Sequence, residues 1–355
     1  MSVLVSIIVP CYNAASTINR TIKSVLKQSC DQWELIMIDD GSDDNTAACI
    51  RKFTDPRIRL FQQKNKGASA ARNHGMQIAH GEWLCFLDAD DALLPDAIST
   101  LLSEIESDTN IIIGCYQNSI SPLPRITPAK AVKISGRRLA ANTLFWQKYE
   151  DDICRDVFAP APALRILNTG APWAKLYRKS FIEQHHLRFN EALVLHEDTL
   201  FNHLAYSHTK EASIIPIPVY CYLDNPASLT RSQNSRYRKH CAAAIGEFSR
   251  LHPDFPEELC FFSMFRILEC WHGIHTATKG DLLSRHRLIR EFMNTPEIRQ
   301  AIPHLPVRRN RYIPLYDKAA IFCIKHKLYL SLIILIPQIQ VLHSFKNRFC
   351  TIFRV

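Results

Sequence analysis

The amino-acid sequence predicts an α/β fold: a mostly parallel sheet flanked by helices, with a helical C-terminal extension. Over residues 1–115, short apolar runs alternate with amphipathic helix patterns. Continuous apolar strands of this kind are typical of parallel sheets that are covered on both faces. The 355 residues are 47% hydrophobic and 22% charged, which allows a sizeable core and excludes disordered and collagen-like chains.

The first strand–helix unit shows the pattern that the rest of this region repeats. Residues 3–9 form a run rich in β-branched residues that stops at Pro10, and an amphipathic pattern follows. Ligands of such sheets bind beyond the carboxyl ends of the strands, so the residues after Val9, Ile38 and Leu87 are where we expect chemistry. The further strands are expected over 35–38, 58–61, 83–87 and 111–115, and the helices over 18–26, 45–53, 68–79 and 95–106.

The pattern is less regular beyond residue 115. Residues 117–135 are rich in Ser, Pro and Lys and are predicted to form a loop, before a mixed region that reaches about residue 235. Residues 236–300 have a helical pattern. The expected organisation is a domain over 1–235 with halves 1–115 and 116–235, a helical extension over 236–306, and a tail over 307–355.

The tail carries almost all of the excess positive charge. The formal net charge is +9, and residues 307–355 contain nine basic residues and one acidic residue, Asp317. Leu328–Leu342 is apolar but too short for the roughly 20 residues that span a bilayer. Such a segment predicts binding to an anionic membrane surface, and a packed helix with solvated basic flanks is the alternative. No basic recognition fold is visible, so nucleic acid is not an expected partner.

The twelve cysteines indicate a reducing compartment. They are scattered, no two form a C-x-x-C pair, and several lie inside apolar runs. The N-terminus lacks a basic stretch followed by a signal-peptide core. We therefore expect a cytoplasmic protein, peripheral on the inner face of the cytoplasmic membrane if the tail binds there.

Polar residues follow three of the predicted strands. They are Pro10-Cys11-Tyr12-Asn13, Asp39-Asp40-Gly41-Ser42-Asp43-Asp44 and Asp88-Ala89-Asp90-Asp91. Asp43 and Asp44 also suit a helix cap. Carboxylates as close as those of the third group repel one another unless a cation or strong donors lie between them. Hard divalent ions bound by carboxylates and substrate phosphates meet that requirement, which predicts a metal–phosphate site.

A small-residue helix start lies between these acidic groups. Lys66-Gly67-Ala68-Ser69-Ala70-Ala71-Arg72-Asn73 opens a helix, and its amides, together with Lys66 and Arg72, favour an anion. Solvated surface positions for the two cations are the alternative. The sequence lacks a G-x-G-x-x-G, a G-x-x-x-x-G-K-[ST] and a G-x-S-x-G pattern, which argues against dinucleotide oxidoreductases, P-loop NTPases and α/β-hydrolases.

In this order, the motifs resemble those of glycosyltransferase family 2, inverting enzymes of GT-A fold that use nucleotide-sugar donors. The resemblance covers about residues 3–235, with 1–115 as the nucleotide-binding half and 116–235 as the acceptor-side half. It implies that Asp40 accepts a hydrogen bond from uracil with Asp39 close by, that Asp90 holds the ribose, and that Asp91 binds Mg²⁺ or Mn²⁺. The acidic run also permits Asp88 or Asp90 as the metal ligand. Further nucleotide-sugar-binding residues are expected at Pro10, Tyr12, Asn13, Lys66, Arg72 and Asp88.

Further motifs resemble the acceptor-side half of non-processive members. Pro172-Trp173-Ala174-Lys175-Leu176-Tyr177 and His196-Glu197-Asp198-Thr199 are two of them, and Tyr220-Cys221-Tyr222 with Ser228-Leu229-Thr230-Arg231 closes that half. The resemblance assigns catalysis to the Glu197–Asp198 pair, with Asp198 as base, and a turn before a helix is the alternative. Trp173 and Tyr222 are expected on the acceptor side, although Trp173 also suits a core position. Arg231 is a third candidate phosphate contact.

The implied function is transfer of one sugar from a UDP-sugar to a hydroxyl of a growing glycan or lipid-linked acceptor. The resemblance places it in lipopolysaccharide, capsule or exopolysaccharide synthesis, and the absence of Q-x-x-R-W predicts single-residue addition. A sugar-1-phosphate nucleotidyltransferase is one alternative, but it would carry a Gly-rich basic loop after the first strand. A non-catalytic nucleotide-sugar-binding scaffold is the other, and it would be expected to lack Asp91 or Asp198.

Overall fold

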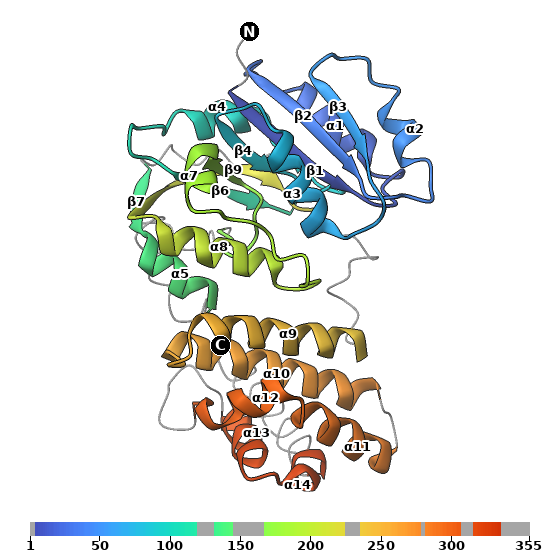
Figure 1. The fold of residues 1–355 in the computed structure, drawn as a ribbon, viewed down its shortest axis with the longest axis vertical. Coiled ribbons are helices and arrows are strands. Elements are labelled where there is room, and N and C mark those ends of the chain that lie inside the picture. The colour runs from blue at the N-terminus through green and yellow to red at the C-terminus, as the bar shows by residue number, and fades with distance from the viewer. Residues whose placement is uncertain are drawn as a thin grey trace, which may run out of the picture. The chain divides into compact units, whose positions relative to one another are not determined.

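A computed structural model describes residues 4–118, 131–144, 167–223, 235–277, 281–306 and 315–334. The chain divides into two compact units, Met1–Ala227 and Ser228–Val355. The first unit, blue to yellow-green in Figure 1, consists of a sheet with helices, and the second, orange to red, is helical. Both parts of the predicted fold class are therefore confirmed.

The predicted parallel strands are present in the first unit. They are β1 (Val5–Cys11), β2 (Trp33–Asp39), β3 (Ile58–Gln62) and β4 (Trp83–Phe86). β1 pairs in parallel with β2 and with β4, and β2 pairs in parallel with β3. The carboxyl ends of β1, β2 and β4 therefore lie at one edge of the sheet.

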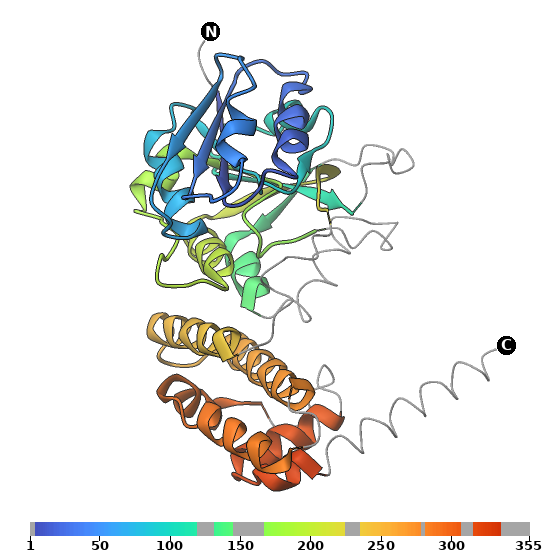
Figure 2. The ribbon, with the colours of Figure 1, turned by 90° about the vertical axis from the view of Figure 1, so that its right-hand side faces the viewer.

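Helices cover both faces of this part of the sheet. Successive residues of a strand point to opposite faces, so Ile8 packs with residues of α3 (Ala68–Ile78) while Ile7 and Val9 pack with residues of α1 (Ile18–Leu26) and α4 (Ala97–Leu102). The short α2 (Thr46–Ile50) follows β2. Figure 2, turned from the first view, shows the helices on the two sides of the sheet.

The close packing of α3 on β1 depends on Gly75. A Cβ atom at this position would lie 2.3 Å from Cγ2 of Ile8, closer than any real contact. The absence of a side chain thus lets α3 lie directly against the strand. This approach fixes where the start of α3, with Arg72, sits relative to the strand ends.

The second half of the unit adds antiparallel strands that the sequence did not predict individually. β8 (Lys175–Arg178) pairs antiparallel with β4 and with β6 (Ile111–Gln117), and β9 (Glu211–Cys221) pairs parallel with β6. Among the described residues the sheet has nine strands, in the order β3-β2-β1-β4-β8-β6-β9-β5, with β7 beside β9. The remaining elements here are β5 (Ala92–Leu93), α5 (Gly136–Leu144), α7 (Lys179–Gln184) and α8 (Glu197–His208).

The loop predicted over 117–135 is wrong at its end. Residues Val132–Ser135 form β7, which pairs antiparallel with β9. Ile134 is buried while its neighbours Lys133 and Ser135 are exposed, as expected of a strand with one solvated face. Four alternating residues after a Pro- and Lys-rich stretch are too short a signal to separate from a loop.

The described residues of the second unit form helices, as predicted for residues 236–300. Its core contains Phe248, Trp271 and Ile289, which are almost fully buried. In the described part of the chain, no helix combines the length and apolarity needed to cross a bilayer. The helices are α9 (Ser235–Leu251), α10 (Glu257–Ala277), α11 (Leu282–Met293), α12 (Pro296–Ala301), η2 (Ile302–His304), α13 (Leu315–Lys325) and α14 (Tyr329–Ile334).

The described part of the tail packs within this unit instead of standing apart from it. Ile321, Ile324 and Leu332 of α13 and α14 are buried. The alternative of a packed helix therefore holds for 315–334, because these apolar residues recur at helical spacing and pack against α10 and α11. Phe322, Leu328 and Leu330 of the same segment are nevertheless exposed. The remainder of the predicted apolar run, 335–342, lies outside the described residues.

Candidate active site

The loops after β1 and β2 are clamped to each other. The backbone N–H of Asn13 donates to Oγ of Ser42 at 3.0 Å, and the backbone N–H of Asp43 donates to Oδ1 of Asn13 at 2.9 Å. Asn13 has a positive φ of 49°, a conformation that asparagine tolerates better than most residues. The Asn13 side chain, expected to bind the nucleotide-sugar, thus bonds to the second loop.

The other two residues expected in the first loop differ in exposure. Pro10 lies within β1 and is partly buried, whereas Tyr12 is 51% exposed beyond the strand end. Asp44, for which helix capping was the alternative, accepts hydrogen bonds from the backbone N–H groups of Ala15 and Thr46. The carboxylate of Asp44 therefore holds the start of α2, and the ring of Tyr12 is exposed to solvent.

Asp39 and Asp40 are buried and hydrogen-bonded within the protein. Asp39 accepts from the backbone N–H of Ser42 at 3.1 Å and from the Gln62 side chain at 3.0 Å. The Asp40 carboxylate accepts from the Gln63 side chain at 2.8 Å and from the backbone N–H groups of Lys66 and Gly67 at 2.9 and 2.7 Å. Asp40 thereby holds the loop that starts α3. The base contact expected of it stays a prediction.

The acidic loop after β4 is held from two sides. Thr17 and Thr21 of the α1 region donate their hydroxyls to the carbonyl of Ala89, both at 2.9 Å. From β9, the Tyr220 hydroxyl donates to Oδ2 of Asp91 at 2.6 Å. The same hydroxyl accepts from the backbone N–H of Asp88 at 3.3 Å. The loop is thus fixed in position before any ligand arrives.

Asp91 points into the protein. It is 2% exposed, and its two oxygens accept from Tyr220 and from the backbone N–H of Leu223. Burial, with the nearby charge of Asp88, raises the pKa of Asp91 to about 7. The Asp91 carboxylate, which was expected to bind the metal, is therefore not exposed to a ligand. Of the alternative ligands, Asp88 has a side chain that is 29% exposed and Asp90 is partly exposed, so the geometry favours these two.

Arg72 joins the acidic loop to the second half of the unit. Its Nη2 donates to Asp88 at 3.0 Å and its Nη1 donates to Glu197 at 3.1 Å, with the guanidinium 5.3 Å from the centre of the Phe189 ring. Burial alone would lower the pKa of Arg72, but the two carboxylates raise it above its usual value. The guanidinium, expected to contact phosphate, is therefore held between two carboxylates.

The Glu197–Asp198 pair opens α8. Residue His196, in the left-handed region at φ 64°, precedes the helix and makes no side-chain capping hydrogen bond to it. Asp198 accepts from the backbone N–H of Thr199 at 2.7 Å. Burial raises the pKa of Asp198 and, with the Asp198 charge, raises the pKa of Glu197 to about 7. A carboxyl group with a pKa near neutrality, beside a second one whose pKa is also raised, suits proton transfer.

Comparison with known proteins identifies the family of the first unit. Residues 6–161 match the sequence profile of glycosyl transferase family 2. The chain carries a glycosyl transferase family 2 domain. It is 26% identical over 337 residues to the uncharacterized glycosyltransferase EpsJ of Bacillus subtilis, covering 87% of this chain and 89% of EpsJ. It is 40% identical over 116 residues to the UDP-Glc:alpha-D-GlcNAc-diphosphoundecaprenol beta-1,3-glucosyltransferase WfgD of Escherichia coli, covering 32% of this chain and 46% of WfgD.

Solved structures share the fold of this glycosyltransferase. S. aureus TarS 1–349 in complex with UDP-GlcNAc aligns with a TM-score of 0.58 and 16% identity, covering 93% of this chain and 90% of TarS 1–349. The mannosyltransferase PcManGT from Pyrobaculum calidifontis, in complex with GDP-Man and Mn²⁺, aligns with a TM-score of 0.50 and 14% identity over 86% of each chain. These likenesses confirm the GT-A type of fold.

The glycosyltransferase domain also contains a buried lysine that sequence reasoning missed. The Lys175 ammonium, fully buried, donates to the carbonyls of Asn168, Ala171 and Trp173 at 2.7, 2.5 and 3.3 Å. Burial lowers the pKa of Lys175 to about 7, although the charge of Asp198 acts in the opposite direction. The signal available was its spacing of two residues from Tyr177, which in a strand places both side chains on one face.

The two aromatic residues expected on the acceptor side differ in exposure. Trp173 is 6% exposed and stacks on Tyr220, with ring centres 4.6 Å apart and an interplanar angle of 10°. Tyr222, 36% exposed, stacks on the same indole at 6.0 Å. Trp173 is therefore a core residue, which was the alternative, and Tyr222 presents the ring that a sugar can reach.

The metal implied by the family resemblance fits the acidic loop. Within the described ranges, no group of three or more His, Cys, Asp or Glu side chains is arranged to hold an ion. Asp88 and Asp90 nevertheless offer two carboxylates at the end of β4, and the only hydrogen bond that Asp88 accepts from described side chains is made to Oδ1. Mg²⁺ is commonly held by one or two carboxylates together with substrate phosphates. The two residues thus suit a cation that binds with a diphosphate.

Two further contacts were predicted, at Lys66 and Arg231. Lys66 lines a cavity beside α3, together with Arg188 and Glu191. Arg231 and the motif Ser228-Leu229-Thr230-Arg231 lie outside the described residues. The residues brought together at the end of the strands are therefore the buried pair Asp39 and Asp40, the acidic loop, Arg72 and the Glu197–Asp198 pair.

Proposed function

We propose that this glycosyltransferase transfers one sugar from a UDP-sugar to a hydroxyl of a growing glycan or lipid-linked acceptor, with inversion and with Mg²⁺ or Mn²⁺. The observation that carries the proposal is the double contact of Arg72 with Asp88 and Glu197. It links the loop that we assign to the donor diphosphate to the pair that we assign to catalysis. The reaction requires the distance between these two sites to be no more than the length of one sugar ring.

Asp198 acts as the general base in this proposal. Its carboxylate takes the proton of the acceptor hydroxyl while that oxygen attacks the anomeric carbon from the face opposite the diphosphate. The new carbon–oxygen bond forms as the bond to the diphosphate breaks, so that configuration inverts and a nucleoside diphosphate leaves. Arg72 keeps Glu197 in place and holds positive charge beside the pair, while Thr199 orients Asp198 through its backbone N–H.

The acidic loop binds the donor. We assign the metal to Asp88 and Asp90. Asp91 instead holds the loop in place through its hydrogen bond from Tyr220. When bound, the cation neutralises charge that develops on the leaving diphosphate. The oxygen donor set supports this assignment, and the complex of the structural neighbour PcManGT contains Mn²⁺.

The relatives support a UDP-sugar and a surface polysaccharide. WfgD is named for UDP-Glc and a diphosphoundecaprenol acceptor, and another relative, ExoO of Rhizobium meliloti, is named for succinoglycan biosynthesis. TarS has been solved with UDP and with UDP-GlcNAc. We therefore propose a role in lipopolysaccharide, capsule or exopolysaccharide synthesis.

We also propose that the chain binds the cytoplasmic face of the membrane through its C-terminal part. Phe322, Leu328 and Leu330 are exposed apolar side chains, and Lys327 is exposed beside them. Exposed apolar groups interleaved with basic ones suit an anionic lipid surface. A lipid-linked acceptor would be found at that surface.

Thermal unfolding of the purified protein tests the donor site. A ligand that binds only the folded state raises stability by RT ln(1 + [L]/Kd). UDP with Mn²⁺ is expected to raise Tm more than GDP, CDP or dTDP, and a chelator is expected to remove the effect. No shift with any nucleotide would favour the non-catalytic scaffold, and a metal-dependent shift with another nucleotide would overturn the uridine assignment.

A further inference from the structure

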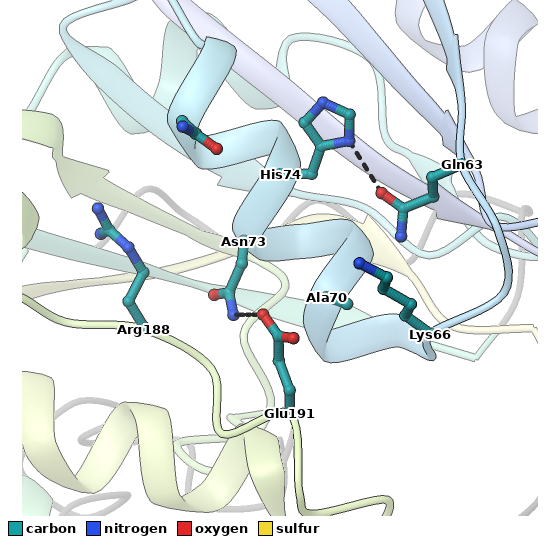
Figure 3. Close-up of a pocket in the computed structure, with 8 residues that line it drawn as sticks. Gln63, Lys66, Ala70, Asn73, His74, Arg188 and Glu191 are labelled. Atoms are coloured by element: carbon teal, nitrogen blue, oxygen red, sulfur yellow. Dashed lines mark hydrogen bonds between the residues drawn. The ribbon is translucent and has the colours of Figure 1, made fainter.

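A polar cavity lies beside α3, apart from the acidic loop. Its volume is about 570 Å³, within the range of pockets that enclose small ligands. One wall is a single face of α3 and the residues before it, and the other is the segment between α7 and α8 (Figure 3). Among the described residues that line it, Ala70 is apolar and the other seven are Gln63, Lys66, Asn73, His74, Gln77, Arg188 and Glu191.

Two cations of this cavity are available to a ligand. Lys66 and Arg188 are exposed, and within the described part of the chain neither forms an ion pair with a carboxylate. To the residues that the structure describes, the Arg188 side chain makes one hydrogen bond, which it donates to the backbone carbonyl of Leu187 at 2.8 Å. In Figure 3 the two cations lie at opposite sides of the cavity, with Asn73 and Glu191 between them. An anionic group can therefore be bound at either end.

The centre of the cavity is built for hydroxyl groups. Asn73 donates to Glu191 at 2.9 Å and exchanges hydrogen bonds of 2.9 Å with the backbone of Phe189. His74 bonds to the Gln63 side chain at 2.8 Å. Both N–H groups of Asn73 are used in these bonds, so the centre offers acceptors, the remaining lone pairs of the Asn73 amide and the Glu191 carboxylate, to the hydroxyl groups of a ligand. The carboxylate of Glu191 also disfavours a second anion at the centre.

Both walls lead to the reaction site. The backbone N–H of Lys66 donates to the Asp40 carboxylate at 2.9 Å, which ties one wall to the loop assigned to the donor. The other wall continues from Glu191 to Glu197 and Asp198 at the start of α8. A ligand in the cavity therefore lies between elements that carry the donor and elements that carry the catalytic pair.

We propose that this cavity binds an acidic sugar of the acceptor glycan, with Arg188 and Lys66 contacting its carboxylate or phosphate groups. The inference rests on the proposed function, because it assigns the cavity to the acceptor. Arginine recognises carboxylate and phosphate in the same bidentate manner, so the two sources of charge share one chemistry. A neutral sugar would leave both cations without a counterion.

Saturation-transfer difference NMR on the full chain tests this inference. The probes are glucuronic acid, glucose 1-phosphate and glucose, each with and without excess UDP. We expect at least one acidic sugar to bind more strongly than glucose and to remain bound with UDP present. Arg188→Gln and Lys66→Gln are each expected to weaken that binding at least about tenfold, the loss typical of one charged hydrogen bond. Lys64→Gln, an exposed lysine outside the cavity, is the matched control.

The outcomes separate this inference from the proposed function. It is overturned if neither acidic sugar binds better than glucose, if UDP displaces the acidic sugar, or if the Arg188 variant binds as the natural chain does. If an acidic sugar binds, the preference between the two probes identifies carboxylate or phosphate as the recognised group. Thermal stabilisation by UDP, measured on the same samples, reports the donor site independently of the cavity.

Discussion

The guanidinium of Arg72 lies 3.1 Å from the carboxylate of Glu197, a residue 125 positions further along the chain. The same side chain lies 3.0 Å from Asp88, and its exposed fraction is 8%. A buried charge is stable only when it is paired and hydrogen-bonded. The positions of the acidic loop and of α8 are therefore linked through one side chain.

Arg72→Ala is expected to destabilise the protein and to inactivate it. Removal of one partner of a buried ionic group costs about 3–5 kcal/mol, since the other charges are left unpaired. Urea unfolding measures the loss. The stability of Arg72→Lys should lie between those of Arg72→Ala and the natural chain, because lysine keeps the charge but cannot donate to both carboxylates in the same way. Arg51→Ala, at an exposed position, should change stability by less than about 0.5 kcal/mol. Equal midpoints for the Arg72 and Arg51 variants would contradict the linkage.

Asp198→Asn is expected to lower kcat by at least about 10²-fold while UDP still stabilises the protein. A positioned general base contributes about 10²–10⁴-fold, and an amide cannot accept the proton. Release of UDP from the correct UDP-sugar and acceptor measures the rate. Asp108→Asn, at an exposed carboxylate, is the control. A normal rate for Asp198→Asn would remove this residue from the role of base.

The rate should depend on pH near neutrality. Burial raises the pKa of Glu197 to about 7, so lowering the pH through 7 protonates Glu197. Burial also raises the pKa of Asp198, so this carboxylate takes up a proton at a higher pH than an exposed aspartate does. A protonated base cannot accept a proton, so kcat is expected to fall as the pH drops and to level off above the apparent pKa. A pH profile of kcat at saturating substrates checks this. A rate that is constant from pH 5 to pH 8 would conflict with these shifts.

Tyr220→Phe is expected to loosen the acidic loop. The variant leaves Asp91 and the backbone N–H of Asp88 without their shared hydroxyl, at a cost of about 1–3 kcal/mol. Weaker stabilisation by UDP with Mn²⁺ should accompany the loss, because the loop is then less well placed. Tyr12→Phe, whose ring is 51% exposed, serves as the stability control. If both variants unfold at the same urea concentration, Tyr220 does not hold the loop.

Membrane binding should depend on the exposed apolar residues of α13 and α14. The double variant Phe322→Ser, Leu330→Ser is expected to bind anionic vesicles at least about tenfold more weakly, because it removes two side chains that would enter the interface. Sedimentation with vesicles of mixed anionic and neutral lipid measures this. Leu283→Ser alters a leucine of the same unit that is 84% exposed. Equal effects of both changes would argue against a specific surface.

The parallel strands and their helices were predictable because each is a local signal. The apolar residues of β1 and β2 form continuous runs, and the spacing of Ile18, Ile22 and Val25 gives α1. β8 was harder to predict because its partners β4 and β6 are far away in the sequence. Its four residues fit a strand only once they pair with those partners.

The identity of the site residues was easier to predict than what each one contacts. The motifs named Asp88, Asp91 and Asp198, but no pattern shows that Asp91 points inward to Tyr220. Nor does a pattern show that Arg72 contacts carboxylates, because the positions of Asp88 and Glu197 relative to it depend on the whole sheet. Contacts between residues that are distant in the sequence arise from tertiary packing, which local patterns do not encode.

Gly75 gives the protein a position where core geometry affects catalysis without contact with a substrate. Any side chain there would push α3 away from Ile8, and Arg72, one turn earlier on the same helix, would move with it. In a saturation mutagenesis screen for activity, substitutions at Gly75 should therefore reduce activity as much as substitutions of active-site residues. A residue with no functional group would then be selected as strictly as the carboxylates.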